Sequence, residues 1–461
     1  MTRSTTTPTP LGRRSTLGGR FAPVPDEING VDLPVEGTLP PELTGRYVRN
    51  GPNPLPGEEP GHLFTGHGML HGVRLRDGRA EWYRNRWVRT GALEGRPYLT
   101  DEGIDYTAVP ANTHVIEHGG RLFALVENGF PYEVDRDLAT VGPCDFDGRL
   151  TTAMTAHPKT DPVTGDLHFF GYSPIPPFLT YHRLSADGTD LVSRPVEVAG
   201  PTMMHDFAIT AEHVLWLDLP MTFQWERLAS GMPFGWDEGY GARIGVMRQD
   251  DPACAVTWFE VDPCYVFHVG GAHTDARGRV VLDAARYAGA DAAAMWEDSA
   301  PGSDPAGRAA ATGAARMYRW TLDPRDGSST GTPLEDRGVE FPTIDESLVG
   351  RAARWCYAIA DRGVDGKRAG AVVKVDADGS TVAHELGPDV TAGEAVFVPS
   401  AAPGRAEDDG WLVTITTTRD GTASQLLVLD ATDVAGAPVA AVTLPRGVPT
   451  GFHGSWFPDP T

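Results

Sequence analysis

The sequence predicts an all-β protein, built either as a β-propeller or as a large β-sandwich. Short runs rich in β-branched and aromatic residues recur along the 461-residue chain, turn signals containing Pro or Gly separate them, and long amphipathic helical patterns are scarce. The runs that we expect to form strands are residues 81–88, 121–127, 166–172, 178–184, 213–219, 243–248, 256–261, 279–287, 316–323, 354–359, 371–379, 411–418 and 425–431.

Four histidines favour the propeller over the sandwich. His157, His205, His268 and His453 each stand in a motif of their own, and they are spread over most of the chain. Only a closed fold brings residues so far apart together, and in a propeller the innermost strands of all blades face one axis. The number of blades cannot be read from repeats, because no WD or kelch signature is present.

These four histidines are candidate metal ligands, because neutral imidazole suits zinc, copper, iron and nickel. A lone histidine in a strand is more often an ordinary core or surface residue. The four motifs taken together therefore carry the assignment of these histidines as metal ligands. His157 precedes the turn DPVTG, which places it at a strand end. His453 lies between Gly451 and Gly454, where missing side chains let the backbone approach a crowded axis.

The densest group of histidines is not expected to bind the metal. His62, His67 and His71 lie together in HLFTGHGMLH, but Gly66 and Gly68 argue against a helix that would align two of them. The remaining histidines, such as His182, are expected to be structural.

Composition excludes several classes of partner. Lys and Arg number 39 against 62 Asp and Glu, and the net charge of −23 repels nucleic acid and anionic lipid. We therefore expect a neutral substrate. The four cysteines, Cys144, Cys254, Cys264 and Cys356, show no CxxC spacing and do not form a disulfide framework. We expect a reduced, cytoplasmic protein.

No segment of the chain predicts a signal peptide or a membrane span. The first residues contain a basic pair without an apolar run behind it, so we expect residues 1–31 to form a disordered or extended tail. No window approaches the roughly eighteen unbroken apolar residues of a span, which leaves peripheral membrane contact at most. The Ala-rich stretch 289–316 is the main candidate for a helix or a long loop.

Several motifs, found in order, resemble the carotenoid cleavage oxygenase family. They are GRYVRNGPNP (45–54), AHPKTDPVTGDLHFFGY (156–172), HDFAIT (205–210), ARIGVM (242–247) and the terminal GFHG (451–454). The resemblance implies that residues 32–461 form a single catalytic domain, a seven-bladed β-propeller with a dome of loops and short helices over the metal face. It also implies Fe(II) on the axis, held by His157, His205, His268 and His453.

The resemblance supplies further site residues. Glutamates accompany three of the histidines in the family, and they match Glu127 in LVENG, Glu340 in VEFPTID and Glu394 in GEAVFV. A ligating histidine usually donates its other N–H to a carboxylate. The alternative, a surface-facing strand position, stays open, above all for Glu340. Thr113 in PANTHV matches a family threonine whose methyl group crowds one vacant iron position and leaves a single site for dioxygen.

The implied reaction inserts both atoms of O2 across a C=C double bond of an apolar alkene, a carotenoid or apocarotenoid, to give two carbonyl products. Iron is assigned by the resemblance, because the ligand type alone does not identify the metal. Structural zinc would more often include Cys, and catalytic zinc normally takes three protein ligands. No nucleotide fingerprint is present, and no organic cofactor is required.

The choice of substrate is less determined. The aromatic-rich segment 222–241 is either an ordinary loop or the lining of an apolar tunnel. The branch of the family that cleaves hydroxystilbenes associates a lysine and a tyrosine with the phenol. Val126 and Trp87 stand at those places, which favours an apocarotenoid over a lignostilbene.

Two alternatives to a dioxygenase remain open. One is a non-oxygenative isomerase with the same four histidines, and the other is a propeller used only as a binding scaffold. The stretch VGGAHTD after His268 departs from the family pattern and is expected to reshape the cavity beside the iron.

Overall fold

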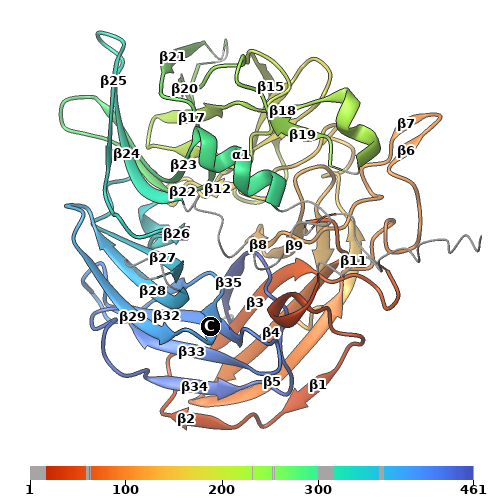
Figure 1. Cartoon of the computed structure of the whole chain (residues 1–461), viewed down its shortest axis with the longest axis vertical. Coiled ribbons are helices and arrows are strands. Elements are labelled where there is room, and N and C mark those ends of the chain that lie inside the picture. Colours follow the sequence, from red (N-terminus) through yellow and green to blue (C-terminus); the bar gives the residue numbers. More distant parts are fainter. Residues whose placement is uncertain are drawn as a thin grey trace, which may run out of the picture.

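The computed structural model describes residues 17–58, 62, 64–230, 232–251, 253, 255–298, 315–362 and 368–459. Seven β-sheets stand as blades around one central axis (Figure 1). Every run that the sequence predicts as a strand falls on a strand. The all-β prediction and the seven-bladed propeller implied by the family resemblance are both confirmed.

Each blade is an antiparallel sheet whose innermost strand lies next to the axis. Blade 1 consists, from the inside outward, of β35 (Gly454–Pro458), β3 (Gly45–Pro52), β4 (Gly68–Arg76), β5 (Arg79–Trp87) and β1 (Asn29–Val31). Blade 2 consists of β8 (His114–His118), β9 (Arg121–Leu125), β10 (Tyr132–Val134) and β11 (Thr140–Pro143). Blade 3 consists of β12 (Lys159–Thr160), β13 (Leu167–Tyr172), β14 (Leu179–Leu184) and β15 (Leu191–Val196).

The other four blades continue around the ring. Blade 4 consists of β16 (Ala208–Ile209), β17 (His213–Asp218), β20 (Arg243–Arg248) and β21 (Val256–Glu260). Blade 5 consists of β22 (Cys264–Thr274), β23 (Val280–Ala288), β24 (Arg316–Asp323) and β25 (Ser328–Pro333). Blade 6 consists of β26 (Glu340–Thr343), β27 (Trp355–Arg362), β28 (Arg368–Asp376) and β29 (Thr381–Gly387). In blade 7, β30 (Val390–Ala392) and β31 (Val396–Pro399) both pair with β32 (Gly410–Thr418). The sheet continues outward through β33 (Ser424–Asp430) and β34 (Ala440–Thr443) to β2 (Val35–Gly37).

Apolar side chains fill the spaces between neighbouring blades. Successive side chains of a strand point to opposite faces of the sheet. Phe169 and Phe170 in β13 therefore enter different buried clusters, the first shared with blade 2 and the second with blade 4. Because these contacts bury the faces of the blades, the edges that face the axis are left for polar side chains.

The two ends of the chain close the ring. The C-terminal strand β35 pairs antiparallel with β3, so that Tyr47 faces Trp456. Near the N-terminus, β2 pairs antiparallel with β34, so that Glu36 faces Ala441. Blade 1 and blade 7 each combine strands from both ends of the sequence, which ties the first and last blades together.

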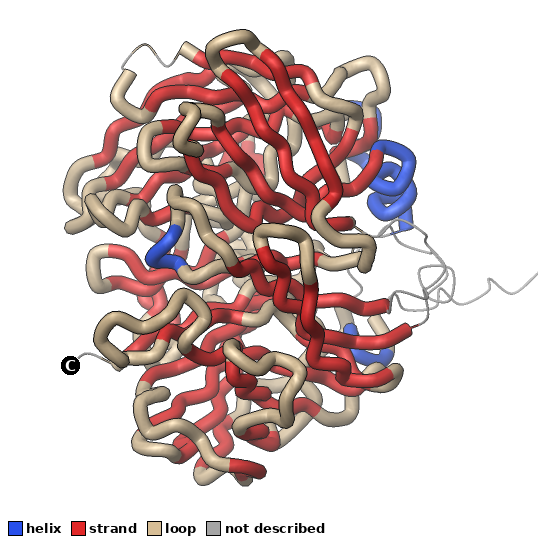
Figure 2. The backbone as a smooth tube through the Cα atoms, turned by 90° about the vertical axis from the view of Figure 1, so that its left-hand side faces the viewer, coloured by secondary structure: helices blue, strands red, loops and turns tan. Residues whose placement is uncertain are grey.

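Helical turns lie on the two open faces of the propeller. The helix α1 (Gly289–Asp298) lies on the same face as the 3-10 helices η1 (Gly19–Phe21) and η2 (Trp225–Ser230), and η3 (Glu346–Leu348) lies on the opposite face (Figure 2). Two short hairpins, β6 (Leu99–Thr100) with β7 (Gly103–Ile104) and β18 (Met221–Phe223) with β19 (Phe234–Trp236), stand outside the blades. No helix in the described part of the chain is both long and apolar enough to cross a membrane.

The predicted tail and the predicted Ala-rich helix are only partly described. Residues 1–16 of the tail lie outside the described residues, and residues 29–31 form β1 on the outer edge of blade 1. The Ala-rich stretch is helical over 289–298, and residues 299–314 lie outside the described part. Cys144, Cys264 and Cys356 carry free thiols, and Cys254 lies outside the described residues.

We expect Gly45→Ala to lower the stability of the folded protein. A Cβ atom at Gly45 would lie 2.5 Å from the carbonyl oxygen of Phe457 and 2.9 Å from the Cα of Pro458, at the seam that closes the ring. Overpacking of this kind typically costs about 1–3 kcal/mol. The measurement is the thermal midpoint by circular dichroism. Gly18→Ala is the control, because a Cβ atom there meets no atom within 4 Å. Equal midpoints for the two variants would contradict a tight seam.

Candidate metal centre

The structure brings four histidines together on the propeller axis. One ring nitrogen from each of His157, His205, His268 and His453 lies within 4.8 Å of the others, and the Nε2 atoms of His157 and His205 are 3.0 Å apart. Within the described residues this is the only group of three or more histidine, cysteine or carboxylate side chains arranged to hold a metal ion.

Each of the four histidines comes from the innermost strand of a different blade, or from the residues directly before that strand. His157 precedes β12, His205 precedes β16, His268 lies within β22, and His453 directly precedes β35. In β22 the pairing register shifts between Val266 and Val269 and again between Val269 and Gly271. Bulges re-aim a side chain. The first of these two shifts contains His268, and the second directly follows it.

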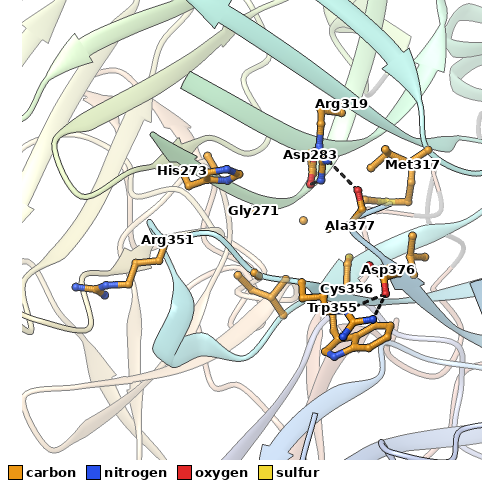
Figure 3. Close-up of a pocket in the computed structure, with 17 residues that line it drawn as sticks. Gly271, His273, Asp283, Met317, Arg319, Arg351, Trp355, Cys356, Asp376 and Ala377 are labelled. Carbon is orange, nitrogen blue, oxygen red and sulfur yellow. Dashed lines mark hydrogen bonds and ion pairs between the residues drawn. The ribbon is translucent and has the colours of Figure 1, made fainter. Parts of the chain in front are cut away.

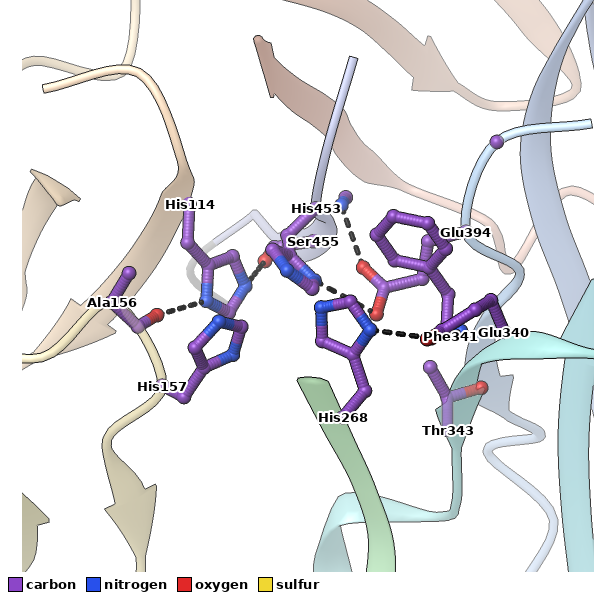
Figure 4. A network of polar contacts seen from close by, with 12 residues as sticks. His114, Ala156, His157, His268, Glu340, Phe341, Thr343, Glu394, His453 and Ser455 are labelled. Atoms are coloured by element: carbon purple, nitrogen blue, oxygen red, sulfur yellow. Dashed lines mark hydrogen bonds and ion pairs between the residues drawn. The ribbon is translucent and has the colours of Figure 1, made fainter. Parts of the chain in front are cut away.

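The three predicted glutamates each pair with one of the histidines through its Nδ1 atom. Glu127 Oε1 lies 2.5 Å from Nδ1 of His205, Glu340 Oε2 lies 2.6 Å from Nδ1 of His268, and Glu394 Oε1 lies 3.1 Å from Nδ1 of His453. Figure 4 shows the last two pairs. A histidine that donates from Nδ1 presents its Nε2 lone pair to a metal.

The carboxylates are themselves held by other donors. Glu127 accepts the hydroxyl of Tyr172 at 2.7 Å, and Glu394 accepts the N–H of Gly454 at 2.8 Å. Glu340 accepts the N–H of Phe341 at 2.9 Å. The alternative that Glu340 faces solvent from the surface is wrong, because its carboxylate is turned inward to a histidine.

The backbone is strained next to Glu340. Phe341 has a φ of +53°, which is rare for a bulky residue. Its ring stacks on that of His268, with 4.5 Å between ring centroids. Strain of this kind persists where the surroundings over-determine the conformation, often at functional sites.

Electrostatics keeps three of the four histidines neutral. Burial lowers the pKa values of His157 and His453 well below their usual range, and neighbouring imidazoles lower them further. Burial, with a smaller effect of His205, lowers the pKa of His268 to about 3. Burial would also lower the pKa of His205, but Glu127, with smaller contributions from Asp206 and Glu340, raises it.

This donor set fits a divalent transition metal. Metal binding requires neutral imidazoles, a condition that the lowered pKa values of His157, His268 and His453 favour. Four neutral nitrogen donors suit zinc, copper, iron and nickel alike, and the glutamate pairs are the partners that orient such ligands.

The backbone of Thr113 contacts that of His453. Its carbonyl oxygen accepts the N–H of His453 at 3.2 Å, and its hydroxyl donates to Oδ1 of Asn112 at 3.1 Å. The hydroxyl hydrogen is therefore engaged with an amide oxygen.

A fifth histidine, His114, lies at the site and was missed by the sequence analysis. Its ring is 5.0 Å from that of His453 between centroids. Its Nδ1 contacts the carbonyl oxygen of Ala156 at 3.0 Å, and its Nε2 contacts Oγ of Ser455 at 3.0 Å (Figure 4). Because both nitrogens are engaged, His114 does not belong to the metal-binding group. In the sequence, only its position directly after Thr113, a predicted site residue, indicates that His114 lies near the site.

The other histidines lie elsewhere, as expected. His71 contacts the hydroxyl of Tyr83 at 2.8 Å, and His67 pairs with Glu58 at 3.2 Å. His62 packs against Phe64, and His182 contacts Thr152 at 2.8 Å.

Aromatic side chains gather on one side of the four histidines. The ring of Phe267 is 5.1 Å from that of His205 and stacks on Trp296 of α1 at 6.4 Å. Phe64 packs edge-on against Phe452 at 5.4 Å and lies 6.1 Å from Trp296. No sequence motif identified these four residues, although Phe267 and Phe452 directly precede two of the predicted ligands.

Only part of the aromatic-rich segment 222–241 packs against other aromatic side chains. Phe234 in β19 packs against Tyr172 at 6.1 Å and against Phe223 at 5.7 Å. Trp225 is 62% exposed and faces solvent.

The stretch VGGAHTD, which departs from the family pattern, lines a hollow between two blades. Gly270, Gly271, Ala272 and His273 line a hollow between blades 5 and 6 (Figure 3). Two ion pairs lie in this hollow, Arg319 with Asp283 at 2.7 Å and Arg354 with Asp376 at 2.8 Å.

Known proteins are similar to this chain in sequence and in fold. Residues 21–458 match the family described as retinal pigment epithelial membrane protein. The chain is 39% identical over 510 residues to a carotenoid cleavage oxygenase of Mycobacterium tuberculosis, covering 96% of this chain and 97% of the relative. It is 34% identical over 489 residues to carotenoid 9,10(9',10')-cleavage dioxygenase 1 of Arabidopsis thaliana, covering 95% and 88%.

Solved structures of similar proteins superpose on the whole propeller. The lignostilbene dioxygenase of Pseudomonas brassicacearum superposes with a TM-score of 0.84 at 28% identity, covering 98% of this chain and 100% of that one. The cobalt-substituted apocarotenoid oxygenase of Synechocystis superposes with a TM-score of 0.79 at 26% identity, covering 95% and 97%.

We expect His205→Ala to lose bound metal while the propeller stays folded, because the core lies between the blades and not on the axis. Metal content by elemental analysis and the circular dichroism spectrum test this. His168→Ala is the matched control, since His168 is buried and contacts only the hydroxyl of Tyr181 among the hydrogen bonds described. Metal near one ion per chain in His205→Ala would remove His205 from the site.

We expect Glu394→Gln and Glu127→Gln to weaken metal affinity by roughly ten- to a hundredfold, the usual effect of losing such a partner. In Glu394→Gln the single amide oxygen can no longer accept from both His453 and Gly454. Competition with a chelator measures the affinity. Glu133→Gln, which removes a surface partner of Arg121, should leave it unchanged. Unaltered affinity in both site variants would show that these glutamates do not support the ligands.

Proposed function

The chain belongs to the family of retinal pigment epithelial membrane protein and the carotenoid cleavage oxygenases, and from this we propose that it is a non-haem Fe(II) dioxygenase acting on a carotenoid or apocarotenoid. In the proposed reaction O2 cleaves a C=C double bond and two carbonyl products leave. Relatives named carotenoid cleavage oxygenase and carotenoid cleavage dioxygenase support an oxygenase. The observation that carries the metal chemistry is the group of four convergent imidazoles, three of them anchored through Nδ1 by glutamates.

In this proposal His157, His205, His268 and His453 hold the iron, and the bound iron supplies the activation of O2. Neutral imidazoles leave the full dipositive charge on the metal. The three glutamates fix the tautomer and orientation of their partners. Deep burial of the ligands keeps bulk water away from the site.

Thr113 is proposed to restrict access to the metal. The side-chain hydroxyl of Thr113 donates to Asn112, and its backbone carbonyl oxygen accepts the N–H of His453. The methyl group is the remaining part of the side chain, and in this proposal it faces the metal. An apolar methyl would crowd a coordination position without binding there.

The aromatic cluster supports an extended apolar substrate. Phe64, Phe267, Trp296 and Phe452 offer ring faces and edges on one side of the four histidines. Conjugated polyenes bind through such apolar contacts and need no charged partner. The net charge of −23 fits a neutral substrate as well.

A lignostilbene is the second candidate substrate. The superposition on a lignostilbene dioxygenase, with a TM-score of 0.84, favours it. Against it, Val126 is 8% exposed within an apolar cluster and supplies no cation for a phenol. Trp87 donates its ring N–H to the carbonyl oxygen of Asn53 at 3.0 Å, so that donor is already used.

We expect the iron-loaded protein to cleave an apocarotenal in preference to 4-hydroxystilbene. Desolvating a phenol without a partner costs about 1–3 kcal/mol, or roughly one to two decades in kcat/KM. Competition assays under 18O2 with mass spectrometry of the products measure the preference and the source of oxygen, with His205→Ala as the blank. Label should enter both carbonyl products.

Three outcomes would contradict the proposal in different ways. Efficient cleavage of 4-hydroxystilbene with no turnover of any apocarotenal would make the stilbene the substrate. An isomerised polyene without incorporated label would indicate the non-oxygenative branch. A protein that takes up no iron would remove the metal chemistry altogether.

A further inference from the structure

An ion pair with a buried carboxylate joins the segments that carry the proposed ligands. Nζ of Lys159 lies 2.7 Å from Oδ1 of Asp206, and the side chains are 19% and 2% exposed. Lys159 belongs to β12 and follows His157 by two positions, and Asp206 directly follows His205. The pair therefore connects the innermost segments of blade 3 and blade 4.

The same carboxylate also reaches blade 5. Its Oδ2 accepts the backbone N–H of Val269 at 2.8 Å, and Val269 directly follows His268. Its Oδ1 also accepts the N–H of Phe207 at 2.8 Å. One side chain thus contacts three of the four ligand-bearing segments, and none of these contacts is with an imidazole.

This arrangement does what packing between the blades cannot do. Burial of apolar surface is roughly proportional to area and has no direction, so it tolerates small sliding movements of one blade against the next. Charge-assisted hydrogen bonds are directional and short. A metal site needs its ligands held within about 0.5 Å of the productive geometry, and the buried carboxylate gives three segments a common fixed point.

We propose that Asp206, together with Lys159, is a positioning element that sets the spacing of the His157, His205 and His268 segments before metal binds. The proposal rests on the four-histidine metal site of the proposed function, and it does not depend on which alkene is cleaved. It assigns Lys159 a role through Asp206 and not through direct contact with metal or substrate.

Charge and position predict opposite effects for Lys159. A cation near the site repels a dication, so if charge alone mattered, Lys159→Met would bind metal more tightly. If Lys159 positions the His157 segment, the same variant binds metal more weakly. The double variant Lys159→Met/Asp206→Asn removes one charge of each sign and leaves the net charge of the pair unchanged. A charge effect then predicts unaltered affinity, and a positioning effect predicts a loss.

The test is a titration of the full-length metal-free protein with Co(II), followed by its visible absorption, with a chelator competition for affinity. We expect about a tenfold weaker affinity for Lys159→Met, and at least that for the double variant, in the range usual for residues that support metal ligands. The absorption bands should also change, because they report the arrangement of the ligands. Neither readout requires enzymatic activity.

Lys374→Met is the matched control. Lys374 is buried and pairs with Asp408 at 2.5 Å, and it donates to the carbonyl oxygen of Ala431 at 2.7 Å, which joins blade 6 to blade 7. Neither contact involves a ligand-bearing segment. We expect this variant to lose thermal stability but to keep its Co(II) affinity within about twofold, a change below 0.5 kcal/mol by the usual conversion.

The outcomes separate this inference from the proposed function. If the unaltered protein binds no Co(II), the metal site itself is wrong. If it binds Co(II) and Lys159→Met binds as tightly or more tightly, with the double variant unaltered, the positioning role is overturned. A loss in Lys374→Met equal to that in Lys159→Met would overturn it too, because the effect would then be one of general stability. Should Lys159→Met fail to fold by circular dichroism, the double variant decides alone.

Discussion

Convergence of four imidazoles on one axis depends on the closure of the ring of blades. His453 directly precedes β35, the C-terminal strand that pairs with β3 and completes blade 1. The last ligand therefore reaches the axis through the same strand pairing that closes the propeller. Because Gly45, Gly451 and Gly454 lie where a Cβ atom would clash with the neighbouring segment, the seam and the metal site require the same close backbone approach.

The fold separates apolar and polar interactions in space. Apolar clusters occupy the interfaces between blades, where they stabilise the ring. Polar side chains occupy the axis. Blades 1, 3, 4 and 5 supply the histidines, and blades 2, 6 and 7 supply Glu127, Glu340 and Glu394. The glutamates that accept from three of the imidazoles favour a dication over a neutral or anionic occupant.

Local irregularities are concentrated where the site is built. The register shifts around His268 and the positive φ of Phe341 both interrupt regular strand geometry at the axis. Regular strands would direct successive side chains to alternate blade interfaces, so a side chain that has to point along the blade edge requires a bulge or a turn. The strain at Phe341 is compensated by its N–H bond to Glu340 and by stacking on His268.

The sequence by itself predicted the all-β class and the four histidines, and the family resemblance added the seven blades and the three glutamates. Strand periodicity is a local property, and the motifs around His157, His205, His268 and His453 are local matches to a family. Only the tertiary structure decided which glutamate serves which histidine, that His114 lies beside the site with both nitrogens engaged, and that Asp206 links three segments. It also placed the VGGAHTD stretch between two blades, and Phe64 and Trp296 beside the histidines. These are contacts between residues far apart in the chain, and no local pattern encodes them, because the ring of blades and not the order of residues sets which side chains meet at the axis.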